Sequence, residues 1–140
     1  MNLSAKTEYA CLAMLELAKQ YGSGEPVQLR CIAAEHGIPS RFLVQILLQL
    51  KGAGLVASTR GAAGGYRLAR SPQEISLLEV IDVVEGENRP ESNAAKDSPF
   101  VRALLGFCRE ATELQRDRLE SESLTDLVSA ATLREPMYFI

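Results

Sequence analysis

The sequence predicts a mainly α-helical protein with one small β-hairpin. Apolar residues recur every three or four positions along most of its 140 residues, which is the pattern of amphipathic helices. One central stretch instead alternates apolar and polar residues around a glycine-rich turn, which is typical of a hairpin. With 46% hydrophobic and 24% charged residues, the composition is that of a globular chain, and the length suits one domain with one extra element.

Three helices are predicted before the hairpin. Ser4 can cap a first helix, which carries apolar residues from Tyr9 to Tyr21 and ends at Gly22. A second helix fits residues 29–36, and a third opens at 39–40 and ends at 52–54. The buried face of the third helix is expected to consist of Leu43, Ile46, Leu47 and Leu50. The tight corner at 35–39 between two helices of these lengths predicts a helix-turn-helix.

The hairpin follows directly. Residues 55–60 and 66–69 predict two strands, with Tyr66 and Leu68 on one face and Arg67 on the other. The glycine-rich tip at 61–65 supplies the positive φ angles that a tight hairpin needs. A hairpin placed directly after a helix-turn-helix is a wing, so the predicted fold is a winged helix-turn-helix.

The rest of the chain predicts one long helix between two short ones. Ser76 and Glu79 form a capping-box pattern for a helix over 77–85, and a polar loop follows. Ser98 and Pro99 open a long helix over 99–119, and a short helix fits 124–130. The long helix has a candidate buried stripe of Phe100, Leu104, Phe107, Cys108, Ala111, Leu114 and Leu119. We therefore expect a winged head at 1–86, a flexible loop at 87–98, and a dimerisation helix with the C-terminal segment at 99–140.

Charge is unevenly distributed along the chain. The net charge is −3, which by itself gives no indication of a nucleic-acid partner. Residues 36–73, however, contain no Asp or Glu and carry five basic residues: Arg41, Lys51, Arg60, Arg67 and Arg70. This acid-free stretch includes both the third helix and the hairpin, which favours DNA binding.

The chemistry of the acid-free stretch suits the two grooves of DNA. In a helix-turn-helix the second helix reads bases from its N-terminal turns, where Arg41 can grip a guanine or a phosphate and Gln45 can pair with an adenine. The glycine tip allows close approach to the minor groove, with Arg60 as the inserted or phosphate-binding cation. The candidate DNA-binding residues are Ser40, Arg41, Val44, Gln45, Lys51, Thr59, Arg60, Gly64, Gly65 and Tyr66. Alternatively, the arginines are only solvated and the tip is a plain hairpin turn.

Several segments of the chain resemble one family of bacterial regulators. Residues 3–10, 38–47, 55–69, 75–80 and 123–127 are similar to the Rrf-type winged-helix family, which includes the iron–sulfur cluster regulator and the nitric-oxide-sensing repressor. The most specific likeness is the wing pattern Arg60-Gly61-x-x-Gly64-Gly65-Tyr66. The resemblance implies a homodimeric, cytoplasmic transcription factor, usually a repressor, whose long C-terminal helix crosses to its partner. Such a dimer would read a near-palindromic operator. The alternative for the long C-terminal helix is that it folds back on its own domain.

The cysteines are the main departure from that family. Its sensing members place three cysteines in or beside the loop after the fourth helix, whereas residues 87–97 here contain none and Cys108 stands alone. A two-iron cluster needs four ligands, so we expect no cofactor. Cys11 and Cys31 fit small core positions, and Cys108 is either a redox-active thiol or a buried helix residue. An unusual metal site of Glu8, His36 and Cys108 across a dimer is the other alternative.

The function that we expect is a sequence-specific DNA-binding transcriptional regulator that acts as a homodimer. The main alternative is a winged-helix module that binds a partner enzyme or regulator without DNA. An enzyme is not expected, because no nucleophile–base pair, paired carboxylates or metal triad is evident. No apolar run reaches the roughly 20 residues of a membrane span and the N-terminus lacks the pattern of a signal peptide, so we expect a cytoplasmic protein. The operator, the effector and the sign of regulation are left open by the sequence.

Overall fold

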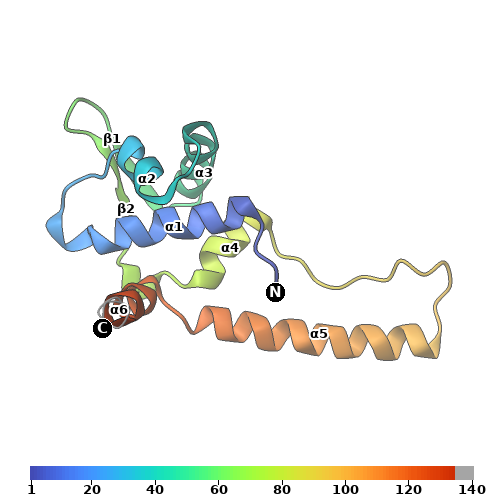
Figure 1. Ribbon diagram of the computed structural model, residues 1–140. Helices are drawn as coiled ribbons and strands as arrows, with labels where there is room; N and C mark the ends of the chain where they lie inside the picture. The colour runs from blue at the N-terminus through green and yellow to red at the C-terminus, as the bar shows by residue number, and fades with distance from the viewer. Residues whose placement is uncertain (135–140) are drawn as a thin grey trace.

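The computed structural model describes residues 1–134 and shows a small head from which one long helix extends (Figure 1). The head contains helices α1 (Ala5–Lys19), α2 (Leu29–His36), α3 (Ser40–Gly52) and α4 (Leu77–Glu85). The last six residues of the predicted 99–140 segment, 135–140, lie outside the described part of the chain.

Local capping explains where these helices begin and end. The Ser4 side chain accepts a hydrogen bond from the Thr7 amide at 3.1 Å, as expected for the cap of α1. Helix α1 ends at Lys19, so Tyr21 lies outside it, in the short 3-10 helix η1 (Tyr21–Ser23), and is exposed. The prediction that Tyr21 belongs to the apolar face of the first helix is therefore wrong.

The core of the head lies where α1, α2, α3 and the hairpin meet. All four residues predicted for the inner face of α3 are buried: Leu43, Ile46, Leu47 and Leu50. They join residues of the other elements in one cluster that includes Met14, Leu17, Ile32, Leu55 and Ile75. Burial of this face leaves the opposite face of α3 toward solvent.

The wing is a two-stranded antiparallel hairpin of β1 (Val56–Thr59) and β2 (Gly65–Leu68), in which Val56 pairs with Leu68 and Thr59 with Gly65. Both strands are shorter or shifted relative to the predicted 55–60 and 66–69. On its other edge, β2 pairs with the segment before α2, because Val27 and Tyr66 exchange both backbone hydrogen bonds at 2.8 Å. The wing is thus attached to the head along one edge.

The expected capping box at α4 is only half formed. The Ser76 side chain accepts from the Glu79 amide at 3.1 Å, but the Glu79 carboxylate pairs with Arg70 rather than returning to Ser76. A complete reciprocal pair that the sequence reasoning missed occurs before α6 (Leu124–Arg134), where Ser123 and Asp126 exchange two hydrogen bonds of 3.0 and 3.1 Å. Helix α6 is longer than the predicted 124–130, and its buried first residue returns to the head.

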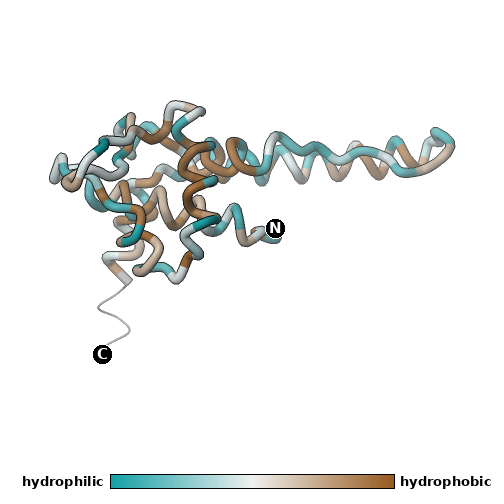
Figure 2. The backbone as a smooth tube through the Cα atoms, turned by 90° about the horizontal axis from the view of Figure 1, so that it is seen from above, coloured by the Kyte–Doolittle hydropathy of each residue, from teal (hydrophilic) through white to brown (hydrophobic). Residues whose placement is uncertain are grey.

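Helix α5 (Pro99–Glu120) stands away from the head along most of its length (Figures 1 and 2). The loop after α4 runs out to its far end, and the helix then returns toward α4 and α6. The stripe that we expected to be buried is exposed in the single chain: Phe100 is 88% exposed, and Phe107 and Leu114 are each 72% exposed. Within residues 1–134 most of this face of α5 is open to solvent, so its burial stays a prediction for the dimer.

Candidate nucleic-acid interface

The outer face of α3 presents the predicted reading residues. Ser40, Arg41, Val44 and Gln45 are all exposed on the first turns of this helix. The Arg41 guanidinium lies 5.0 Å from the centre of the Phe42 ring, a cation–π distance that restrains the side chain while leaving its N–H groups available. No side chain caps the start of α3 at Pro39 and its first turn holds no acidic residue, so the Ser40 and Arg41 amides have no hydrogen-bond partner among residues 1–134. This surface offers hydrogen-bond donors without a competing carboxylate.

Two residues of the acid-free stretch bind other parts of the head. The Arg70 guanidinium pairs with Glu79 and donates to the Glu74 carbonyl at 2.8 Å, so its charge is engaged within the chain. Gln49 is exposed on α3, and its amide donates to the Val83 carbonyl of α4 at 3.2 Å. Gln49 and Val83 are 34 residues apart on different helices, and Arg70 and Glu79 are nine apart, so helical periodicity does not reveal either contact.

The other basic residues of the stretch remain on the surface. Arg41, Lys51, Arg60 and Arg67 are exposed, and within residues 1–134 the ion pairs involve other side chains. Lys51 donates to the Ser58 hydroxyl at 2.7 Å, which places its ammonium between the end of α3 and β1. The charge of this surface is therefore positive even though the whole chain is negative.

Some of the predicted DNA-binding residues of the wing are exposed, and others pack within the protein. Thr59 and Arg60 are exposed, whereas Gly64 is buried and Tyr66 is half-buried against the core. A Cβ on Gly64 would collide with the Thr59 carbonyl, and one on Gly65 would collide with the Val27 carbonyl. Close approach of DNA at the glycine tip stays a prediction, and the packing of the chain itself also requires glycine at both positions. Gln28, which that reasoning missed, donates to the Ala62 carbonyl at 3.2 Å and ties the tip to the start of α2.

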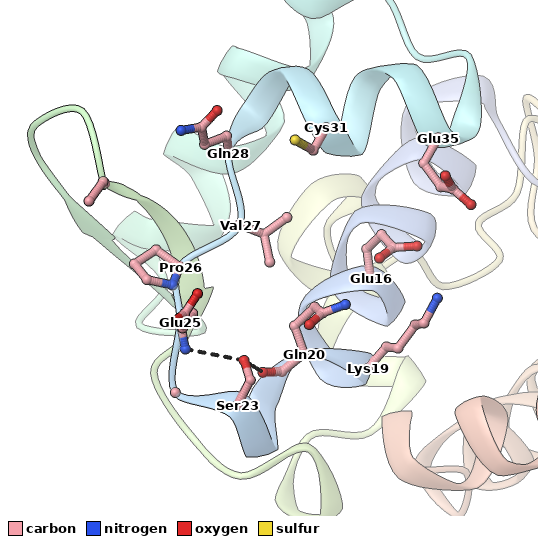
Figure 3. A pocket seen from close by; sticks show the side chains of 13 residues that line it. Glu16, Lys19, Gln20, Ser23, Glu25, Pro26, Val27, Gln28, Cys31 and Glu35 are labelled. Carbon is pink, nitrogen blue, oxygen red and sulfur yellow. Dashed lines mark hydrogen bonds between the residues drawn. The ribbon is translucent and has the colours of Figure 1, made fainter.

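The three cysteines lie on three different helices. Cys11 on α1 is half-buried, and burial raises the pKa of its thiol to about 11. Cys31 on α2 is exposed beside a depression between α1, α2 and the wing, where Glu16 and Glu35 also lie (Figure 3). The expectation that Cys31 is a small core residue is therefore wrong. Cys108 on α5 is half-buried.

These donors do not fit an iron–sulfur cluster in one chain. A two-iron cluster requires four ligands, and within residues 1–134 no three His, Cys, Asp or Glu side chains gather as a metal site would need. His36, part of the alternative metal site, instead has its Nε2 atom 3.1 Å from the Glu16 carboxylate. No helix among the described residues is both long and apolar enough to cross a membrane.

Comparison with known proteins gives matches over nearly the whole chain. Residues 3–130 match the family model Rrf2, described as an iron-dependent transcriptional regulator. The HTH-type transcriptional regulator CymR of Bacillus subtilis (strain 168) is 37% identical over 129 residues, which cover 92% of this chain and 91% of CymR. The solved structure of CymR, the global cysteine regulator of B. subtilis, aligns with a TM-score of 0.78 at 35% identity and covers 93% of this chain and 98% of that one. IscR of T. potens aligns with a TM-score of 0.76 at 32% identity and covers 94% and 88%.

Proposed function

Since this chain belongs to the Rrf2 family of helix-turn-helix transcriptional regulators, we propose that it is a homodimeric repressor that binds one near-palindromic operator. The observation that carries the proposal is the positively charged surface formed by α3 and the wing. Residues 1–86 would bind DNA, 87–98 would link, and 99–140 would dimerise. Because its target is chromosomal DNA, we place the protein in the cytoplasm.

The exposed residues of α3 would read bases in the major groove. Arg41 can donate two hydrogen bonds to a guanine, Gln45 can pair with an adenine, and Val44 can pack on a thymine methyl group. The uncapped first amides of α3 and the Ser40 hydroxyl suit a phosphate group. Lys51, Thr59 and Arg60 lie at the margins, where they would hold the DNA backbone and the minor groove.

The exposed stripe of α5 supports the homodimer. Phe100, Leu104, Phe107 and Leu114 form an apolar face on a 22-residue helix, and a second copy of the same helix is the partner that matches its length and chemistry. Two heads joined in this way would place their α3 helices about 34 Å apart, one turn of DNA. Their occupation of the operator would exclude polymerase, which is the basis for proposing repression.

We further propose that regulation does not use an iron–sulfur cluster. The support is the donor set: residues 87–107 contain no cysteine, and the three thiols lie on separate helices. Absorption spectra of protein prepared without oxygen check this proposal. We expect no absorption band in the visible range. Bands near about 400 nm, as intense as those of a protein that carries an iron–sulfur cluster, would contradict the proposal.

The salt dependence of DNA affinity tests the proposed function. We expect the logarithm of the association constant for the operator to fall linearly with the logarithm of salt concentration, because each phosphate contact releases counterions. Arg60→Ala should weaken binding to all sequences and reduce the slope by about one, whereas Arg41→Ala and Gln45→Ala should relax base preference by about 1–3 kcal/mol at one position. Arg102→Ala, on α5, is the control and should change neither quantity. Salt-independent affinity, or unchanged binding in the three interface variants, would contradict the proposal and favour a module that binds proteins.

A further inference from the structure

The last turn of α4 contacts three other elements through residues that are nearly consecutive. Asp82 binds α5, the Val83 carbonyl binds α3, and Glu85 accepts hydrogen bonds from Ser4 and Thr7 at the start of α1. The same turn therefore lies between the helix proposed to dimerise and the helix proposed to read DNA.

The contact with α5 is a bidentate ion pair. Arg116 donates to both carboxylate oxygens of Asp82, at 3.0 and 2.8 Å, and also reaches Glu87 at 3.2 Å. Its side chain is only 14% exposed, although most of α5 faces solvent. A bidentate guanidinium–carboxylate pair restricts rotation as well as distance, because two parallel hydrogen bonds must be kept.

The contact with α3 uses a carbonyl that α4 cannot satisfy itself. Val83 belongs to the last four residues of α4, whose carbonyls have no successor amide in the helix. The Gln49 amide supplies a donor at 3.2 Å. Gln49 lies one turn after Gln45 on α3, so this bond holds the reading helix directly.

Two contacts near its C-terminal end hold α5 to the head, in addition to the ion pairs that Arg89 and Glu87 of the loop after α4 make with Glu113 and Arg116. One is the Asp82–Arg116 pair, and the other is the chain that leads into α6, where the Leu124 amide donates to the Ile75 carbonyl at 3.0 Å. Each of these contacts reduces the freedom of α5 to rotate relative to the head. Loss of the Asp82–Arg116 pair would give α5 more freedom to turn about its C-terminal end.

We propose that the last turn of α4 is a rigid joint between α5 and α3, and that Arg116 and Gln49 are positioning residues that set the half-site spacing accepted by the dimer. This inference rests on the proposed function. One base pair changes the separation of half-sites by about 3.4 Å and their relative rotation by about 36°, so small rotations at the joint alter which spacing fits.

The test measures affinity as a function of spacing. An operator is first selected by the wild-type protein from random-sequence duplex DNA, and duplexes are then made with one base pair added or removed between the half-sites. For the wild type we expect each change to weaken binding about tenfold or more; for Arg116→Gln and Gln49→Ala we expect about threefold or less. Affinity for a duplex with a single half-site should stay within about twofold in all proteins.

Arg109→Gln is the matched control, because Arg109 is exposed two turns earlier on the same face of α5. It should keep the spacing profile of the wild type. The double exchange Asp82→Arg with Arg116→Asp should restore the profile, which separates lost geometry from a lost fold.

The outcomes distinguish the two proposals. If the wild type selects no DNA, the proposed function fails and this inference fails with it. If the wild type has a sharp spacing optimum and either Arg116→Gln or Gln49→Ala keeps it, the joint is wrong while the proposed function stands. If both variants lose the optimum and keep half-site affinity, the joint is supported.

Discussion

Gly64 is the residue at which the wing tolerates least change. A Cβ at this position would lie 2.1 Å from the Thr59 carbonyl oxygen, which is far inside van der Waals contact. This oxygen belongs to the backbone, so it cannot move aside as the end of a flexible side chain can. We expect Gly64→Ala to lower the free energy of unfolding by about 1–3 kcal/mol and to weaken DNA binding through a displaced Arg60. Urea unfolding and operator titration measure the two effects.

Gly22→Ala is the control for that experiment. An added Cβ at Gly22 meets no atom within 4 Å, so the methyl group should be nearly neutral. Equal stability of the two alanine variants would show that the wing adapts and that Gly64 is not needed for packing.

The cysteines should differ in reactivity. Burial raises the pKa of the Cys11 thiol to about 11, so little thiolate forms at pH 8, whereas Cys31 is exposed. We expect iodoacetamide at pH 8 to modify Cys31 well before Cys11 in the folded protein, as mass spectrometry of timed samples would show. A Cys31→Ser variant controls for the assignment, and equal rates at both thiols would contradict the burial of Cys11.

At the scale of residues, the sequence predicts the environment of a side chain where the signal is local. The inner face of α3 follows from periodicity alone, and its four buried residues were predicted correctly. The roles of Gln49, Arg70 and Cys31 were not predicted, because they depend on which distant element packs beside them. Opposite charge gave one usable signal: Glu74 and Glu79 closely follow Arg70 in the sequence.

At the scale of elements, the hydrogen bonds between the start of α1 and the end of α4 make the stability of the fold depend on pH. The Ser4 and Thr7 hydroxyls donate to the Glu85 carboxylate and hold its pKa below the ordinary value of 4.5. A carboxylate whose pKa is lower in the folded state stabilises the fold above its unfolded pKa, and this contribution is lost as pH falls through the folded value. We therefore expect the melting temperature to fall between about pH 5 and pH 3, and to fall less steeply in Glu85→Gln.

Asp126 contributes in the same direction, because hydrogen bonds from Ser123 lower its pKa. The Glu85→Gln variant should accordingly keep part of the pH dependence. Glu91→Gln, in the exposed loop after α4, is the control and should follow the wild type. Superimposable pH profiles of the wild type and Glu85→Gln would mean that the contact with α1 does not stabilise the fold.

Element boundaries were predictable where a cap lies next to the helix in sequence. The bounds of α2 and α4 agree with the predicted 29–36 and 77–85, because Gly37, Ser76 and Gly86 act locally. The half-formed capping box at α4 was not predictable in the same way, since Arg70 competes for Glu79 from another segment. The bridge between Val27 and Tyr66 on the free edge of β2 likewise depends on a pairing across the fold.

At the scale of the whole molecule, the apolar stripe of α5 should control assembly. We expect Phe107→Asp to convert the protein to a monomer, because a carboxylate in the middle of the stripe would be buried without a partner. Sedimentation velocity measures the assembly, and far-ultraviolet circular dichroism should be unchanged since Phe107 is 72% exposed in the single chain. Glu110→Gln on the same helix is the control.

A dimeric Phe107→Asp protein would contradict the assigned role of the stripe. A wild-type protein that is monomeric at micromolar concentration would contradict the homodimer itself. The exposure of this stripe could be predicted only in part: the apolar pattern of residues 99–119 was evident, but whether the helix returns to its own head is decided by tertiary structure.

The distribution of charge also becomes meaningful only for the folded molecule. The net charge of −3 is the sum over two different parts of the molecule. The surface of α3 and the wing carries exposed arginines, whereas the C-terminal part is rich in carboxylates. Such a division should orient the approach to DNA, because the acidic part is repelled by phosphate while the basic surface is attracted.

Selection from random-sequence duplex DNA by the wild-type protein tests the central claim most directly. We expect enrichment of a near-palindromic sequence whose half-site centres lie about one helical turn, roughly 10 base pairs, apart. Enrichment of no sequence, or of one unrepeated site bound by a single chain, would contradict a homodimer that reads DNA through α3 and the wing.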